Sequence, residues 1–353
     1  MHPCHARRDH RCGIAAITRR HLSRDGGGRL VRGMNAIQIR RFGGPDVLEL
    51  VDLPVPEPGP GQVLIRVGAC GVNFAETLMR EDDYIASYQL PATPGSEVAG
   101  TIAALGDGVD GLTVGQRVGA VLAAAKQLTG GYAEYVVANA AVVAALPDGM
   151  DFAPATGLLV QGLTALYLVR AVPPAGRRVL VTAGGGGVGS LLIQLIRSAG
   201  AAHVTAAASS EPKRAAALQA SADAAIGYED IASGQFDLIF DSVGGDVLPR
   251  CLEALAPLGT IVTYGALNLQ SFELGVTDLR RMVFGNQSLR GFAFGPLVDL
   301  ATLRGDLETL FELHRSGRLN VQFHALPLGE ATQAHRLLAD RASIGKLVLI
   351  PEG

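Results

Sequence analysis

The residues of this chain that are best suited to chemistry form a glycine-rich turn. A short apolar run, Val179 to Val181, is followed by Gly184-Gly185-Gly186-Gly187-Val188-Gly189 and then by apolar residues at helical spacing. Glycine permits close approach of the backbone, and the free N–H groups at a helix N-terminus can meet the negative charge of a pyrophosphate. A G-x-G-x-x-G turn between a strand and a helix therefore predicts a dinucleotide site.

The alternative interpretation is a flexible turn, but the following segment completes a βαβ unit. Val188, Leu191, Leu192, Leu195 and Ile196 are spaced as on one face of a helix. Gly200 then marks the end of that helix, and residues 203–207 read as a second strand. This context favours the dinucleotide interpretation.

The residues after the second strand indicate which dinucleotide binds. NAD sites usually place an acidic side chain here, which accepts a hydrogen bond from the adenosine ribose 2′-hydroxyl. This chain instead reads Ser209-Ser210-Glu211-Pro212-Lys213-Arg214, and such hydroxyls and cations can hold a 2′-phosphate. Ser210 can also act as a helix N-cap with Lys213 as a solvated side chain, and both interpretations can hold together. The pattern favours NADPH.

Composition indicates a soluble enzyme of two domains. The chain has 353 residues, 48% of them hydrophobic, with a pI of about 6.2 and no apolar run that looks long enough to span a bilayer. The basic charge is concentrated in residues 1–33, so the rest of the chain is clearly acidic. We therefore expect no nucleic-acid binding and no membrane span.

Residues 1–33 lack hydrophobic periodicity and are predicted to be a disordered extension. Their richness in arginine is also compatible with a mitochondrial-type targeting segment, but a strand-like run starts at Met34, and we favour an upstream extension. No two cysteines have metal or redox spacing. This cysteine usage fits a reducing compartment and predicts a cytoplasmic protein.

The rest of the chain divides by pattern. Residues 38–145 read as short β segments broken by proline and glycine, which predicts a compact β domain. Residues 237–241 and 260–264 look like buried parallel strands of the nucleotide unit. Residues 301–338 are helical in pattern, and residues 346–350 form a strand that we expect to return to the first domain.

Five segments together resemble a known family. They are Ala69–Glu76, Pro94–Gly100, Gly130–Tyr135, Gln161–Ala165 and Gly186–Gly189. In this order they resemble the zinc-independent quinone oxidoreductase (zeta-crystallin-like) branch of the medium-chain dehydrogenase/reductase superfamily, over Met34 to Pro351. The resemblance implies an α/β fold with a GroES-like β-rich catalytic domain (34–155, completed by 300–353) and a Rossmann NADP-binding domain (156–299).

The resemblance also bears on metal binding. Zinc-dependent alcohol dehydrogenases of the same superfamily place Cys, His and Cys ligands at positions that match Asn73, Ser96 and Gln161 here. Residues 114–131 contain no cysteine, so the lobe that holds a structural zinc is absent as well. We therefore expect no metal, and Glu97 alone remains from that constellation.

A reductase without a metal needs an electron-poor carbon and a donor for the developing enolate. Quinones and α,β-unsaturated carbonyls meet this need better than unactivated ketones. The implied function is therefore NADPH:quinone reduction. An ene-reductase of α,β-unsaturated carbonyls or enoyl thioesters is the alternative, and an NADPH-binding protein with little turnover is a further one.

The resemblance places Asn73 and Tyr84 at the substrate and nicotinamide cleft. Tyr84 matches the proposed proton donor of related enoyl-thioester reductases, and a phenol is protonated at neutral pH. The family commonly has a glycine shortly before this tyrosine, whereas this chain has Glu81-Asp82-Asp83. Tyr84 is otherwise a loop aromatic, and Asn73 a turn-forming asparagine.

The remaining assignments concern the cofactor and assembly. Lys213 and Tyr228 match positions that hold the 2′-phosphate, and Thr164 matches a nicotinamide contact unless it only bonds its own helix backbone. The predicted cofactor residues are Asn73, Thr164, Gly184, Gly186, Gly187, Val188, Gly189, Ser209, Ser210, Lys213, Tyr228, Gly265, Phe292, Phe294 and Lys346. Phe292 and Phe294 are alternatively core aromatics. A homodimer is the expected assembly.

Overall fold

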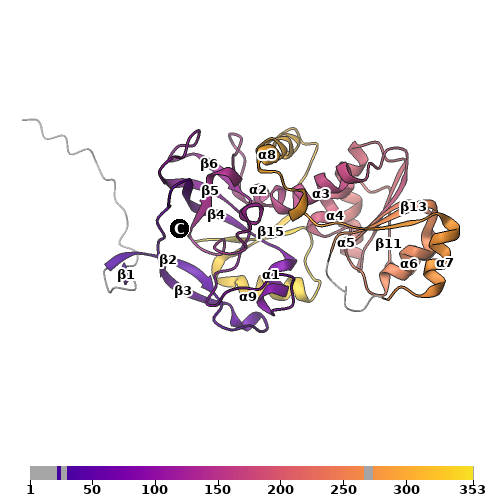
Figure 1. The fold of residues 1–353 in the computed structure, drawn as a ribbon, viewed down its shortest axis with the longest axis horizontal. Helices are drawn as coiled ribbons and strands as arrows, with labels where there is room; N and C mark the ends of the chain where they lie inside the picture. Colours follow the sequence, from indigo (N-terminus) through magenta and orange to yellow (C-terminus); the bar gives the residue numbers. More distant parts are fainter. Residues whose placement is uncertain (1–21, 25–29, 266–272, 353) are drawn as a thin grey trace, which may run out of the picture.

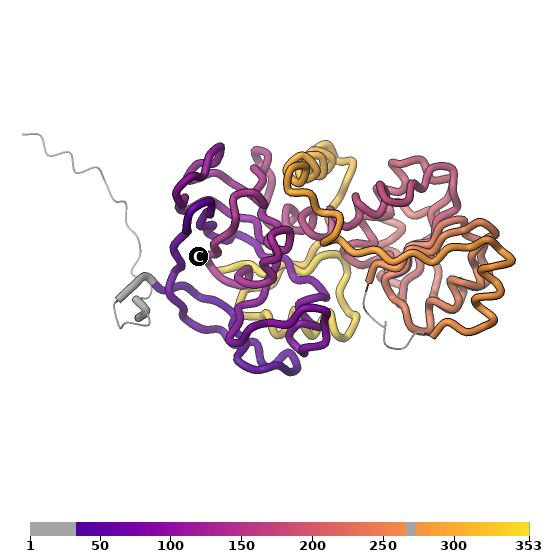
Figure 2. Tube along the Cα trace, viewed as in Figure 1, coloured from indigo at the N-terminus to yellow at the C-terminus, as the bar shows by residue number. Residues whose placement is uncertain are grey.

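The computed structural model describes residues 22–24, 30–265 and 273–352. Figure 1 shows two lobes along the long axis of the molecule, and the C-terminus lies within the lobe that also contains the first strands. The tube in Figure 2 shows that the last part of the chain returns to this first lobe after the middle part has built the second.

The first lobe contains a seven-stranded sheet of order β15-β16-β4-β5-β6-β8, with β7 paired to β4. The strands are β4 (Gln62–Val72), β5 (Val98–Leu105), β6 (Arg117–Ala120), β7 (Tyr135–Asn139), β8 (Val143–Ala145), β15 (Phe323–Pro327) and β16 (Lys346–Ile350). The residues of β4 are mostly buried, because sheet partners and helices cover them. The C-terminal strand β16 pairs antiparallel with β4, with Val348 opposite Gly71.

A smaller antiparallel sheet precedes the seven-stranded sheet in the sequence. It contains β1 (Leu22–Arg24), β2 (Leu30–Gln38) and β3 (Glu49–Pro54) in that order. The prediction of disorder over residues 1–33 falls mainly outside the described residues. Where residues of this segment are described, they differ from the prediction: β2 starts at Leu30 rather than Met34 and pairs with β1. A three-residue strand is too short to show periodicity, so its partner defines it.

Short helices cover the first lobe and join it to the second. They are η1 (Pro45–Val47), α1 (Phe74–Arg80), η2 (Leu122–Ala125), η3 (Ala140–Val142), α2 (Phe152–Leu158), α8 (Leu300–Arg315), η7 (Leu328–Glu330) and α9 (Ala331–Ala339). The helical stretch Phe152–Ala171, which combines α2 with the first helix of the second lobe, is long and apolar enough to cross a membrane. By length and composition this stretch departs from the expectation that no apolar run is long enough for a span. Of the most apolar 18 residues of this stretch, 67% are buried inside the protein, as in a core helix.

The second lobe is built on a six-stranded parallel sheet of order β11-β10-β9-β12-β13-β14. Its strands are β9 (Arg178–Thr182), β10 (His203–Ala207), β11 (Ala224–Ile226), β12 (Phe236–Asp241), β13 (Leu255–Thr263) and β14 (Ser288–Gly291). Its helices are α3 (Val160–Ala171), α4 (Gly187–Ser198), α5 (Glu211–Gln219), η4 (Tyr228–Ser233), α6 (Val247–Ala254), α7 (Val276–Gly285) and η6 (Gly295–Leu297).

This strand order reverses between β9 and β12. The first crossover runs from β9 to β10 in one direction along the sheet, whereas β12 lies on the other side of β9. The order is that of the Rossmann fold, in which ligands bind outside the carboxyl ends of the strands at the point of reversal. The structure therefore confirms the predicted α/β class and locates the predicted glycine turn at that point.

Candidate active site

The glycine turn connects β9 to α4 under tight packing. A Cβ on Gly189 would lie 2.3 Å from the carbonyl oxygen of Ala183, and a Cβ on Gly184 would lie 2.7 Å from the Cβ of Ala206. These glycines allow α4 to approach the sheet closely. A Cβ on Gly186 would meet only the Ala183 oxygen within 4 Å, so this glycine borders open space. The turn therefore fits the backbone approach that a pyrophosphate requires.

The N-terminus of α4 faces this open side. Gly186 is the N-cap residue, and the first helical hydrogen bond runs from the Ser190 amide to the Gly186 carbonyl. The amides of Gly187, Val188 and Gly189 precede it and have no partner inside the helix, which is the property of every helix N-terminus. They supply N–H groups and a positive dipole end to an anion.

The first lobe contacts the glycine turn through its last strand. The Gly345 amide donates to the Gly185 carbonyl at 2.9 Å, and Gly345 also pairs with Gly186 as an isolated bridge. Gly345 has φ of +65°, a conformation that glycine adopts without strain. The residue directly before β16 is thus tied to the predicted pyrophosphate turn.

The predicted 2′-phosphate residues lie beside the turn. Ser209 is exposed, Ser210 is the N-cap residue of α5, and Lys213 follows in the first turn of that helix. A Cβ on Gly185 would lie 2.7 Å from the Lys213 carbonyl oxygen, so α5 packs against the glycine turn. The Lys213 ammonium donates to the Arg341 carbonyl, and partial burial followed by the charge of Arg341 lowers its pKa.

Arg341 is a cation that sequence reasoning missed here. It is exposed, adopts φ of +51° and lies close enough to affect the pKa values of both Lys213 and Tyr228. Burial raises the pKa of the half-buried Tyr228 phenol. The only signal in the sequence was an arginine close to the predicted last strand, and no local pattern connects it with residues more than one hundred positions earlier.

A buried carboxylate orders the loop that follows β12. Asp241, at the end of β12, accepts hydrogen bonds from Thr182 Oγ1 at 2.7 Å and from the Val243 and Gly244 amides. Burial raises its pKa, and these donors oppose the shift. A Cβ on Gly265 would lie 2.4 Å from the Ser242 carbonyl oxygen, so the predicted cofactor residue Gly265 is needed for the close packing of two loops.

Three other predicted cofactor residues lie in protein contacts. Phe292 and Phe294 are partly buried and pack against the core, and Phe294 stacks on Tyr167 with ring centroids 6.1 Å apart. Thr164 Oγ1 donates to the Val160 carbonyl of its own helix at 2.6 Å. These residues thus adopt the arrangements that we gave as alternatives, core aromatics and a helix-bonded threonine.

A buried polar cluster lies where the two lobes meet. Asn73 follows β4, Glu97 precedes β5 and Lys346 begins β16, and they are 8%, 0% and 1% exposed. Lys346 Nζ donates to Asn73 Oδ1 at 2.6 Å and to the Glu97 carboxylate, and Asn73 Nδ2 donates to Glu97 Oε1 at 2.8 Å. The predicted cofactor residue Lys346 is therefore bonded within the protein, beside Asn73.

A second carboxylate extends this cluster. Glu76 Oε1 accepts from Ser96 Oγ at 2.5 Å, and Glu76 Oε2 accepts from the backbone N–H of Asn73 at 2.5 Å. Burial raises the pKa of Glu76 to about 7, although the Ser96 hydroxyl and the charge of Lys346 oppose the shift. The sequence offered Glu76 only as part of a matching segment, and no pattern placed it beside Ser96.

The three positions that match zinc ligands lie in or against this cluster. Gln161 Nε2 donates to Asn73 Oδ1 at 3.4 Å, and Ser96 bonds Glu76. Amide and hydroxyl oxygens are poor substitutes for thiolate and imidazole, and the Lys346 ammonium already places a positive charge against Asn73. The described residues contain no group of three His, Cys, Asp or Glu side chains suited to a metal ion. The donor set does not fit zinc.

Tyr84 lies on the loop that follows α1. It is partly buried and packs against the core of the first lobe. Burial, followed by the charge of Glu76, raises the pKa of its phenol above the ordinary value of 10. The phenol therefore stays protonated at neutral pH and can act as a proton donor.

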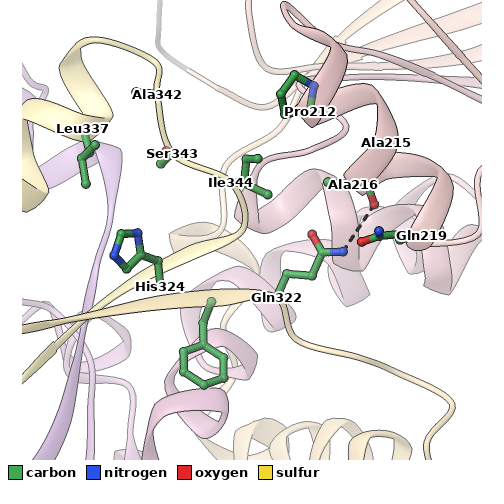
Figure 3. Close-up of a pocket in the computed structure, with 11 residues that line it drawn as sticks. Pro212, Ala215, Ala216, Gln219, Gln322, His324, Leu337, Ala342, Ser343 and Ile344 are labelled. Atoms are coloured by element: carbon green, nitrogen blue, oxygen red, sulfur yellow. Dashed lines mark hydrogen bonds between the residues drawn. The ribbon is translucent and has the colours of Figure 1, made fainter.

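A pocket of about 530 Å³ lies between α5, β15 and the loop before β16, as Figure 3 shows. Gln322 crosses it and donates to the Ala216 carbonyl at 3.4 Å. Pro212 and Ala215 line this pocket, whereas Lys213 and the other predicted site residues do not. The pocket borders the predicted 2′-phosphate site without being part of it.

Two protein-family models match parts of this chain. Residues 59–148 match the alcohol dehydrogenase GroES-like domain, and residues 218–349 match the zinc-binding dehydrogenase model. The second description names a metal whose ligands this chain does not carry at the matching positions.

Relatives narrow the assignment. A probable quinone oxidoreductase of Schizosaccharomyces pombe is 33% identical over 89% of this chain and 96% of its own length. The quinone oxidoreductase of Pseudomonas aeruginosa is 33% identical over 89% of this chain and 99% of its own length. The structure of Escherichia coli quinone oxidoreductase complexed with NADPH has a TM-score of 0.81 at 28% identity, over 90% of this chain and all of that one. The chain therefore belongs to the quinone oxidoreductase, zeta-crystallin-like branch of the medium-chain dehydrogenase/reductase superfamily, and it is an enzyme of the oxidoreductase class.

Proposed function

We propose that this protein is a zinc-independent reductase that uses NADPH to reduce quinones. The observation that carries the proposal is the placement of the Asn73–Glu97–Lys346 cluster one residue away from Gly345, which is bonded to the glycine turn. This arrangement links an amide donor to the glycine turn through two consecutive residues, Gly345 and Lys346. NADPH would supply the hydride when bound.

The described residues fit two phosphate groups of that cofactor, the central pyrophosphate and the 2′-phosphate of the adenosine ribose. The amides at the start of α4 and the open face of Gly186 suit the pyrophosphate. Ser209, Ser210, Lys213 and Tyr228, with Arg341 nearby, suit a 2′-phosphate. The related Escherichia coli structure, a complex with NADPH, supports this assignment.

The chemistry of the acceptor follows from the donors in the cleft. Hydride addition to a quinone places negative charge on a carbonyl oxygen, which a hydrogen-bond donor stabilises. Asn73 provides an N–H, and Tyr84 provides a phenol whose raised pKa keeps it protonated. The acceptor gains the hydride with its two electrons and a proton from the phenol, so a quinone becomes a hydroquinone and NADPH would become NADP+.

Reduction of an α,β-unsaturated carbonyl is the second candidate. Tyr84 favours it, because an enolate needs a proton at carbon or oxygen before product is released, and a protonated phenol can supply one. An NADPH-binding protein with little turnover is the third candidate.

The test follows NADPH absorbance with a quinone, a 2-alkenal, an enone and an enoyl thioester as separate acceptors, with NADH controls. Oxidation driven by the quinone alone supports the proposal. Faster turnover of an alkene substrate by orders of magnitude makes the protein an ene-reductase. Binding of NADPH without turnover of any acceptor favours the third candidate.

We further propose a cytoplasmic homodimer whose subunits associate through the far edge of the second lobe. The edge strand β14 is largely exposed, and α7 carries Val276, Val283 and Phe284 at 66%, 71% and 85% exposure. Such an exposed apolar surface at a sheet edge is typical of an interface. Phe284→Asp is expected to convert a dimer into a monomer in analytical ultracentrifugation. A monomeric protein before substitution would rule out this interface.

We also propose that the chain forms two domains. Residues 34–155 and 300–353 form the catalytic domain, and residues 156–299 form the NADP-binding domain. Hydrogen exchange that shows residues 156–299 opening as a unit separate from residues 34–155 and 300–353 would test this division.

A further inference from the structure

Three segments distant in sequence meet at Asn73. Glu97 and Lys346 lie 24 and 273 positions away from it, and both contact its amide. The two charged side chains also bond each other and are fully buried. A buried ion pair with a neutral amide wedged against both partners is a fixed arrangement rather than a surface contact.

The chemistry of the two partners determines the orientation of the amide. An ammonium can only donate, so the group facing Lys346 must be the Asn73 carbonyl oxygen. An ionised carboxylate can only accept, so the group facing Glu97 must be the Asn73 amide nitrogen. Exchange of the two amide atoms would break both contacts, and Gln161 Nε2 adds a third donor toward the oxygen at 3.4 Å.

The surroundings are built around this pair. A Cβ on Gly71 would lie 2.2 Å from Glu97 Oε1 and 2.7 Å from Lys346 Cε, so only glycine leaves room at that position. Glu97 Oε2 is held separately by the Val160 amide at 2.7 Å. Lys346 follows Gly345, whose amide is bonded to the glycine turn. Each charged group is therefore anchored by a different element.

We propose that Lys346 and Glu97 are positioning residues that fix the Asn73 amide so that its second Nδ2–H is presented to a carbonyl oxygen in the cleft. One of the two Nδ2 hydrogens bonds Glu97, and among the described residues no hydrogen bond involves the other. The inference deepens the proposed function and rests on it for the identity of the reaction.

The carbonyl oxygen belongs either to the acceptor or to the carboxamide of the nicotinamide ring. Either carbonyl oxygen can accept a hydrogen bond from the Nδ2–H. In the first case, a misoriented Asn73 amide lowers kcat/KM for the substrate and leaves the affinity for NADPH unchanged. In the second case it also raises the Kd for NADPH, which protein or NADPH fluorescence measures directly.

The decisive variant is the double substitution E97Q/K346M. Lys346→Met alone leaves the Glu97 charge buried without its partner and can simply prevent folding. The double variant removes both charges together while keeping an acceptor for the Asn73 amide. Lys126→Met serves as the control, since Lys126 is one of only three lysines and is exposed at the end of η2.

We expect E97Q/K346M to lower kcat/KM about 100-fold, because misplacing a contacting group by about 1 Å has effects of that order. In an Asn73→Ala background, the same double substitution should cause almost no further loss, because Lys346 and Glu97 act through Asn73. Lys126→Met should match the unmodified protein. Equal losses in both backgrounds would overturn the inference and leave the pair a purely structural role.

A crystal structure of E97Q/K346M provides a readout that does not depend on turnover. The expected result is an Asn73 side chain that has rotated or occupies two orientations. An unchanged Asn73 amide overturns the inference. If the unmodified protein reduces none of the four acceptors with NADPH, the proposed reaction fails, and this structure still decides whether Lys346 and Glu97 orient Asn73.

Discussion

Two cations of one short segment, Arg341 and Lys346, lie in different environments. Lys346 is buried with its charge matched by Glu97, whereas Arg341, five residues earlier, is exposed beside Lys213. The first cation belongs to a cluster that the protein satisfies internally. The second lies at the surface, close enough to Lys213 to lower its pKa.

The difference follows from desolvation. An unpaired charge in the interior destabilises the fold by several kcal/mol, so Lys346 requires a carboxylate partner from within the chain. At the surface, water screens repulsion between neighbouring cations, and Lys213 can remain close to Arg341. A buried cation therefore fixes geometry, whereas the partly buried Lys213 and the exposed Arg341 stay accessible to solvent.

Gly71→Ala is expected to have the largest effect, because it disrupts the buried ion pair of Lys346 and Glu97. Its Cβ would overlap both Glu97 and Lys346, and disrupting a buried ion pair lowers the free energy of unfolding by about 3 to 5 kcal/mol. Urea denaturation measures the change. Gly44→Ala is the matched control, since a Cβ there meets nothing within 4 Å. Equal stability of the two variants would show that the cluster adapts without cost.

Glu76 predicts a pH dependence of stability. Because burial raises its pKa from the ordinary 4.5 to about 7, the folded protein binds more protons than the unfolded chain between these values. The Glu76 contribution to the free energy of unfolding therefore falls by roughly 3 kcal/mol as pH rises through that window, and is constant above it.

Glu76→Gln removes the titrating group and should flatten this part of the profile. Urea denaturation of both proteins at pH 5 and pH 8 tests the expectation. A profile that is identical in the variant assigns the pH dependence to other groups.

Tyr84 is partly buried, so its burial is intermediate between that of Lys346 and that of Arg341. Tyr84→Phe is expected to lower kcat for an enone by about 100-fold, which is the low end of the contribution of a general acid. The effect on a quinone should be smaller, since water can protonate a reduced quinone. Steady-state kinetics with both acceptors measures the ratio, and unchanged rates on both would remove Tyr84 from the mechanism.

Lys213→Ala tests the proposed 2′-phosphate site beside Arg341 and should have the smallest effect. Loss of one charge-assisted hydrogen bond of about 1.5 kcal/mol raises KM for NADPH about tenfold. KM for NADH should stay nearly unchanged, because NADH lacks the 2′-phosphate. An equal increase for both cofactors contradicts the assignment of Lys213 to that phosphate.

Much of the fold was predictable because its signals are local. The apolar strand, glycine turn and helix spacing around Gly184 to Gly189 predicted a βαβ unit, and the parallel sheet has the corresponding Rossmann order. Two features were not predictable in this way. The pairing of β1 with β2 has no periodic signature, and α2 joins α3 into one apolar stretch that only burial identifies as core.

The candidate site was predictable to a smaller extent. Residue types at Asn73, Ser96 and Gln161 indicated the loss of zinc ligands, because ligand chemistry depends on the side chain itself. Glu76, Arg341 and the role of Lys346 could not be predicted, because their partners are brought close by pairing of β16 with β4 and by docking of α5 on the glycine turn.

The amino-acid sequence by itself determined the nucleotide turn, the preference for a 2′-phosphate and the absence of zinc-type ligands at three positions. These properties depend on backbone freedom and on the donor atoms of neighbouring residues. Only the tertiary structure decided that Lys346 lies buried between Glu97 and Asn73. Charge pairing in the interior acts over a few ångströms, and chain folding alone brings residues 73, 97 and 346 within that range.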